Sequence, residues 1–188
     1  DDLSLNVWHH IVFTWDGKSC DLSSVKIYID GNLAGQHANS VSGTGTRDAD
    51  SSSDLKLGNG SSATLNLQGF MDEARLYNRA LSATEVKQLY NWSPKYNDGP
   101  APIGWWKFDE TIGTTATDSA AGHSGTLVNG PTWATGKVGG AISLDGVDDA
   151  VSFGDVSITE NTSNVTVSLW TKSLTDQVAV QYLLMADG

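Results

Sequence analysis

Two of the seven tryptophans in this chain of 188 residues are candidates for binding a ligand. Indole rings fill protein cores, and they also stack on the flat faces of sugars. Trp105 precedes Trp106 in a predicted strand, so Trp105 should face outward if Trp106 faces the core. Trp133 comes soon after Pro131 and is expected in a loop. We therefore predict that Trp105 and Trp133 contact carbohydrate or a neighbouring module, whereas the tryptophans of predicted strands are expected in the core: Trp8, Trp15, Trp106 and Trp170.

The acidic residues gather in turns, where carboxylates either bind calcium or cap the turn. Asp145, Asp148 and Asp149 share one short loop. Ca²⁺ takes six to eight oxygen ligands, so three neighbouring carboxylates are a candidate cluster. Carboxylates also accept hydrogen bonds from the backbone of their own turn. We favour a solvated hairpin for this loop.

Residue patterns typical of catalysis are missing from the sequence. A glycosidase needs two carboxylates about 5 to 10 Å apart, but the adjacent Asp72 and Glu73 are expected on opposite faces of a strand. The same alternation separates His9 from His10, so one face does not offer both rings to a metal. No G-x-S-x-G nucleophile motif occurs. The chain is predicted not to be an enzyme.

Charge and hydrophobicity restrict the partners. With 11 Lys and Arg against 22 Asp and Glu, the formal net charge is −11, which repels nucleic acid and anionic lipid. The longest apolar runs are far shorter than the ~20 residues of a membrane-spanning helix, so no membrane insertion is expected. Cys20 is the single cysteine and has no partner within the chain.

Alternation of apolar and polar residues predicts a chain of antiparallel strands. Ser82 and Glu85 form a capping-box pattern, which predicts one short helix near 82–90. Residues 38–54 are too polar to pack and should be a surface loop. The expected strands are Trp8 to Trp15, Val25 to Ile29, Leu55 to Leu57, Gly69 to Tyr77, Gly104 to Phe108, Ala141 to Leu144, Ala150 to Phe153, Val165 to Thr171 and Gln181 to Met185.

Several motifs resemble a laminin G-like module of the concanavalin A-like lectin/glucanase superfamily. Three lie in the first half of the chain, at residues 6–17, 25–31 and 69–82, and look like the C-terminal half of such a module. Others, at 104–110, 118–125 and 139–149, look like its N-terminal half. The resemblance implies an all-β fold, an antiparallel jelly-roll β-sandwich with one short helix.

The order of the two halves is inverted relative to that module. Residues 1–92 are predicted to be the C-terminal part of a module, and residues 104–188 the N-terminal part. Residues 93–103 hold three of the four prolines and are predicted to be a linker. Either the chain spans the end of one module and the beginning of the next, or the two halves fold as one permuted sandwich.

The resemblance also implies a function and a metal. It implies a non-catalytic binding or adhesion module of a larger extracellular or cell-surface protein, recognising carbohydrate or protein. Two alternatives are a spacer of a surface filament, self-associating by complementation of half-modules, and the ancillary domain of a polysaccharide-degrading enzyme. A structural Ca²⁺ is implied where the first and last strands meet, with the candidate ligands Asp72, Glu73, Asp109, Glu110 and Asp118. The simpler alternative is that Asp118 caps a turn and Glu73 pairs with Arg75 or Arg79.

Overall fold

The computed structural model describes residues 3–17, 24–34, 54–58, 67–91, 100–120, 122–154, 164–175 and 185–187. Cys20, residues 38–53 of the predicted loop and residues 93–99 of the predicted linker lie outside these ranges. No helix among the described residues is long and apolar enough to cross a membrane.

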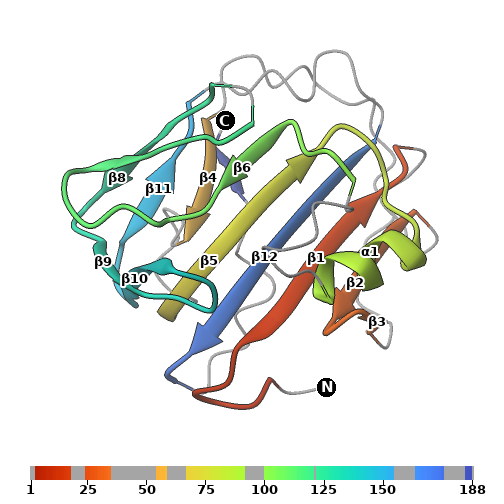
Figure 1. Ribbon diagram of the computed structural model, residues 1–188, viewed down its shortest axis with the longest axis horizontal. Coiled ribbons are helices and arrows are strands. Elements are labelled where there is room, and N and C mark those ends of the chain that lie inside the picture. The colour runs from red at the N-terminus through yellow and green to blue at the C-terminus, as the bar shows by residue number, and fades with distance from the viewer. Residues whose placement is uncertain are drawn as a thin grey trace.

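Two antiparallel sheets make up the body of the described chain (Figure 1). Sheet A has eight strands: β3 (Asn32–Leu33), β2 (Val25–Ile29), β1 (His9–Trp15), β12 (Val165–Ser173), β5 (Gln68–Tyr77), β10 (Gly140–Asp145) and β9 (Thr132–Thr135) in spatial order, with β6 (Gly104–Trp106) also paired to β5. Sheet B has five: β13 (Met185–Asp187), β4 (Asp54–Gly58), β11 (Ala150–Ser152), β8 (Gly125–Val128) and β7 (Thr115–Ala116).

Each sheet contains strands from both halves of the chain, and some of them are direct neighbours. Strand β12 lies between β1 and β5, and Figure 1 shows it in blue between a red and a yellow strand. Strands β10 and β6 also pair with β5, and β11 pairs with β4. The two segments that resemble half-modules therefore form one sandwich together in this structure.

The main core lies between the sheets. Met71, Ala74 and Leu76 of β5 face Leu57 and Val151 of sheet B within one buried cluster. Burying such side chains is the principal source of stability for a fold of this kind. The expected role of Trp106 is confirmed, because its side chain is in this cluster at 1% exposure.

Helix α1 (Ala83–Tyr90) covers part of the face of sheet A that is turned away from the main core (Figure 1). The predicted capping box is present: the Ser82 hydroxyl accepts a hydrogen bond from the Glu85 amide, and the Glu85 carboxylate accepts one from the Ser82 amide. Val86 and Leu89 of the helix pack in a second buried cluster with Val12, Tyr28, Tyr77 and Leu81. Trp170 is also buried on this side, where its ring stacks on Tyr90.

Four short strands were not predicted: β3, β7, β8 and β9. Each has two to four residues, a length at which alternation identifies some strands, such as β6 and β11, and misses others. The expectation that Trp133 lies in a loop is wrong, because β9 contains it and pairs with β10. Trp8 and Trp15 are only partly buried. Of the predicted strand Gln181 to Met185, residues 181–184 lie outside the described part.

Candidate functional site

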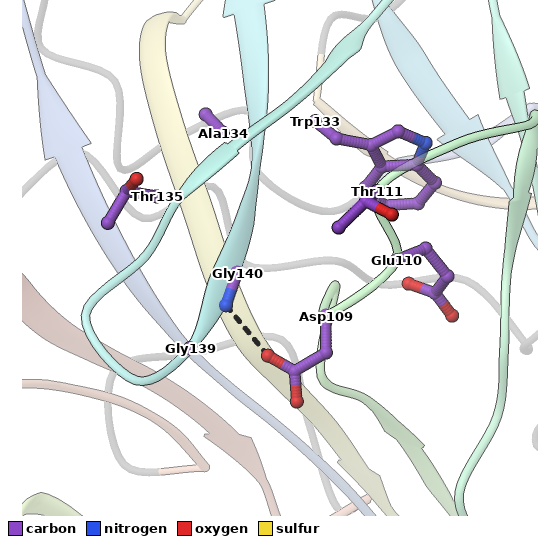
Figure 2. A pocket seen from close by; sticks show the side chains of 8 residues that line it. All are labelled: Asp109, Glu110, Thr111, Trp133, Ala134, Thr135, Gly139 and Gly140. Carbon is purple, nitrogen blue, oxygen red and sulfur yellow. Dashed lines mark hydrogen bonds between the residues drawn. The ribbon is translucent and has the colours of Figure 1, made fainter.

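A pocket of about 570 Å³ opens beside the β9–β10 hairpin and the segment that follows β6. Figure 2 shows its lining: Asp109, Glu110, Thr111, Trp133, Ala134, Thr135, Gly139 and Gly140. This volume is in the range of ligand pockets, which commonly combine aromatic side chains with a few placed polar groups. The pocket brings together three residues that the sequence singled out: Asp109, Glu110 and Trp133.

Trp133 supplies the large apolar surface of the pocket. Its backbone pairs with Ile142 of β10, and its ring packs in part against the main core. The indole Nε1 donates a hydrogen bond to the Gly113 carbonyl at 2.9 Å. The ring is therefore fixed by strand pairing, packing and a hydrogen bond while it lines the pocket.

Each of the two carboxylates in the pocket accepts a hydrogen bond from a backbone amide through one of its oxygens. Asp109 Oδ1 accepts a hydrogen bond from the Gly140 amide at 2.7 Å, drawn as a dashed line in Figure 2. Glu110 Oε1 accepts one from the Thr117 amide at 2.7 Å. Glu110 Oε2 is buried and has no hydrogen-bond partner. Burying a charged oxygen without a donor is unfavourable, so this pocket-lining residue carries an unsatisfied acceptor.

The two glycines of the pocket leave no room for a side chain, because Phe108 and Asp109 approach their backbone closely. A Cβ at Gly140 would lie 2.4 Å from the Phe108 carbonyl oxygen. Gly139 has φ +68°, and a Cβ there would lie 2.2 Å from Asp109 Oδ1. Both glycines lie in the motif at 139–149, but the sequence alone did not assign them to a site. Two adjacent glycines at the start of a strand indicate that another part of the chain approaches the backbone closely, and here that part is Phe108 and Asp109.

Asp118 caps a turn, which is the role predicted for it as the alternative to binding calcium. Its Oδ1 accepts hydrogen bonds from the amides of Trp105 and Ala120, each at 2.8 Å. Its Oδ2 accepts one from the His123 amide at 3.0 Å. Three backbone donors therefore surround this carboxylate.

Asp72 and Glu73 lie on the same face of β5, so the expectation of opposite faces is wrong. Met71 and Ala74 both belong to the inner core, which leaves two outward residues between them instead of one. The register with β12 shifts between Ser168 and Trp170, and Glu73 has φ +52°. A β-bulge of this kind inserts one extra residue and interrupts the alternation of side chains.

Glu73 forms a buried network with Arg75 and Trp105. Glu73 Oε2 accepts hydrogen bonds from Arg75 Nη2 and from Trp105 Nε1, both at 2.7 Å. The Glu73 and Arg75 side chains are 2% and 5% exposed. Burial raises the pKa of Glu73, while the Arg75 charge and the indole hydrogen bond oppose the rise. Glu73 therefore pairs with Arg75, one of the two partners expected.

Trp105 faces outward, as predicted, but cations lie over its ring. Lys107 Nζ is 4.3 Å from the ring centroid and Arg75 Cζ is 4.8 Å from it. Such cation–π contacts are favourable when the cation is partly desolvated. A ligand that stacks on Trp105 has to compete with them, unlike a ligand in the pocket beside Trp133.

Asp72 is fully buried against the β9–β10 turn. Its Oδ2 accepts a hydrogen bond from the Val138 amide at 2.9 Å, and its Oδ1 has no partner. Burial raises the pKa of Asp72 to about 7, and the charge of Glu73 adds to the rise, whereas the amide hydrogen bonds oppose it. Asp72 thus holds the turn that carries Gly139 and Gly140, without lining the pocket itself.

The five proposed calcium ligands do not form one cluster in the described part of the chain. In the described part of the chain, the acidic side chains that are close enough to share an ion are Asp145, Asp148 and Asp149, whose oxygens lie within 4.8 Å of one another. Asp145 Oδ1 accepts a hydrogen bond from the Val147 amide, and Asp149 Oδ2 accepts one from the Asp145 amide. These are the hydrogen bonds expected of a hairpin turn.

Residues 1–87 match a family model, Laminin_G_3, described as the concanavalin A-like lectin/glucanases superfamily. These residues form a laminin G-like segment of that superfamily. The matched range includes β1 to β5 and the beginning of α1. With its two antiparallel sheets, the chain has a concanavalin A-like β-sandwich fold. No match was found among curated proteins or among solved structures.

Proposed function

We propose that this laminin G-like chain is a non-catalytic carbohydrate-binding module of a larger extracellular or cell-surface protein. The observation that carries the proposal is the pocket, where the Trp133 ring lies beside the carboxylates of Asp109 and Glu110. An aromatic ring offers a surface for the apolar face of a sugar, and carboxylate oxygens accept hydrogen bonds from its hydroxyl groups. The superfamily's description names both lectins and glucanases, and carbohydrate is the ligand common to the two.

The distribution of perturbed carboxylates favours binding over catalysis. A glycosidase acid needs a raised pKa at the position of the scissile bond. Burial raises the pKa values of Asp72 and Glu73, but neither residue lines the pocket. Each carboxylate that does line it has one oxygen on a backbone amide.

Assembly into a filament receives less support. That alternative relied on half-sandwiches that need a second chain to complete them. Strand β12 fills the position between β1 and β5 within the same chain. An ancillary domain of a polysaccharide-degrading enzyme would use the same pocket, so the same experiment tests it.

The test is a glycan array followed by calorimetry on the glycans retained. Trp133→Ala removes the ring, and Thr111→Trp fills the pocket from an exposed position without altering the core. Both substitutions should abolish retention. Trp15→Ala is the matched control, because Trp15 is also partly buried but lies on β1, four strands and about 19 Å from β9.

A wild-type protein that retains no glycan would contradict the proposal. Retention that survives in both pocket variants would instead move the binding site elsewhere, and Trp105 would be the next ring to replace.

A further inference from the structure

We infer that the pocket, taken as the carbohydrate site proposed above, selects sugars that carry a free ammonium group and rejects acidic sugars. The inference depends on that proposed function and adds the ligand's charge. It follows from which charged groups line the pocket, where the neighbouring cations are held, and which oxygens are available.

The lining carries negative groups and no positive one. Asp109 and Glu110 contribute two carboxylates, and none of the lining residues is a lysine, arginine or histidine. The negative charge of Asp109 extends beyond the pocket, since it is one of the causes that raise the pKa of Glu73. A uronic acid would place a third carboxylate beside these two, and like charges at short range repel.

The lysines nearest in sequence do not neutralise this charge within the pocket. Lys107 precedes Asp109 by two residues, but its ammonium lies over the Trp105 ring. Lys137 belongs to the turn before Gly139, but its ammonium lies 4.7 Å from the centroid of the Trp170 ring. Both cations are therefore held by aromatic rings that do not line the pocket.

The oxygens and the ring suit an ammonium group. An ammonium has three donors and no acceptor, so it bonds to carboxylates without leaving an acceptor unpaired. Glu110 Oε2 is buried without a partner, and Figure 2 shows the second oxygen of Asp109 turned away from the Gly140 amide. Trp133 adds a ring face that attracts cations. An N-acetylated sugar has lost this charge, keeps one N–H donor and adds a carbonyl acceptor.

Calorimetry with three oligosaccharides of equal length tests the inference: an oligomer of glucosamine, one of N-acetylglucosamine and one of galacturonic acid. At a mildly acidic pH, where the amine is protonated, the glucosamine oligomer should bind about tenfold more tightly than the acetylated one. The galacturonic acid oligomer should show no binding. Added salt should weaken the preference, because it screens the charges.

Two substitutions remove the charges while keeping the shape. Asp109→Asn retains an oxygen for the Gly140 amide, and Glu110→Gln retains one for the Thr117 amide. Each should reduce the preference for the ammonium sugar by several-fold. Asp148→Asn is the matched control, because it removes one exposed charge beyond the other end of β10, about 17 Å along the strand from Gly140.

The outcomes separate this inference from the proposed function. If the wild-type protein retains no glycan on the array, the proposed function fails and the inference with it. If glycans are retained but the glucosamine oligomer does not bind, or its binding survives Trp133→Ala, the inference about this pocket is wrong. If binding is lost in Trp133→Ala but the acetylated or acidic oligomer binds as tightly as the glucosamine oligomer, the pocket binds sugar and the inference about charge is wrong.

Discussion

Asp72 and Glu73 are neighbours in β5, and both side chains leave the same face of the sheet. The bulge at Glu73 places them there, between the inward residues Met71 and Ala74. One carboxylate then fixes the β9–β10 turn, and the other forms an ion pair with Arg75. Neither buried acid lines the pocket, and their different environments lead to distinct predictions.

Replacing Arg75 should destabilise the fold strongly. Arg75→Met leaves Glu73 as a buried charge without its cation, and breaking such a pair from one side costs about 3 to 5 kcal/mol. Urea unfolding measures the loss. The double variant Arg75→Met with Glu73→Gln removes the stranded charge and should recover part of the stability. A double variant as unstable as Arg75→Met would show that the ion pair is not the cause.

Asp72 should make stability fall as the pH rises from about 4 to about 7. The pKa of this carboxyl is 3.8 in a model compound and about 7 in the folded protein. Between these values the native state keeps a proton that the unfolded state has released, so unfolding becomes easier by up to about 1.4 kcal/mol per pH unit. Above pH 7 both states are ionised, and this dependence ends.

The variant Asp72→Asn isolates this effect, because its amide resembles the protonated acid at every pH. Its stability relative to the wild type should increase from pH 4 to pH 7 and then stay constant in urea unfolding. His10, whose pKa burial lowers to about 3, destabilises both proteins alike as the pH falls below 6.5, so it cancels in the difference. A difference that does not change with pH would contradict the raised pKa of Asp72.

Asp118 should stabilise the fold equally with and without calcium. Its carboxylate accepts three backbone hydrogen bonds, and Asp118→Asn removes the acceptor used by the His123 amide. The expected loss is about 1 to 3 kcal/mol in excess calcium and in EDTA alike. A bound ion stabilises the native state by mass action, so a loss seen only with calcium would assign Asp118 the metal role that the family resemblance implies.

Ser82→Ala should cost about 1 kcal/mol, because it removes the hydroxyl that accepts a hydrogen bond from the Glu85 amide at the start of α1. Thermal unfolding measures it. Thr84→Ala is the matched control. Thr84 lies in the first turn of the helix and is exposed, so its replacement should be neutral or slightly stabilising. Equal effects of the two substitutions would show that capping is not what Ser82 contributes.

Long elements with a regular pattern were predictable, whereas four of the short strands were missed. The strands β1, β5 and β12 have seven to ten residues, enough for alternation to show, and the capping box located the start of α1 at Ser82. Strand β9 has four residues and contains Trp133, whose strand conformation depends on pairing with β10. The prediction of a loop therefore failed at one of the pocket's main residues.

The sequence by itself determined the all-β class, the helix and the acidic, aromatic character of the candidate ligands, because these depend on composition and local periodicity. The tertiary structure decided which of those residues meet. Asp109 and Glu110 follow β6, whereas Trp133 lies in β9, and they meet because the chain after β6 packs against the β9–β10 hairpin. The bulge at Glu73 likewise depends on the register with β12, nearly a hundred residues away in the chain. Alternation within one strand carries no information about such a partner, so the face of Glu73 is set by pairing across the sheet.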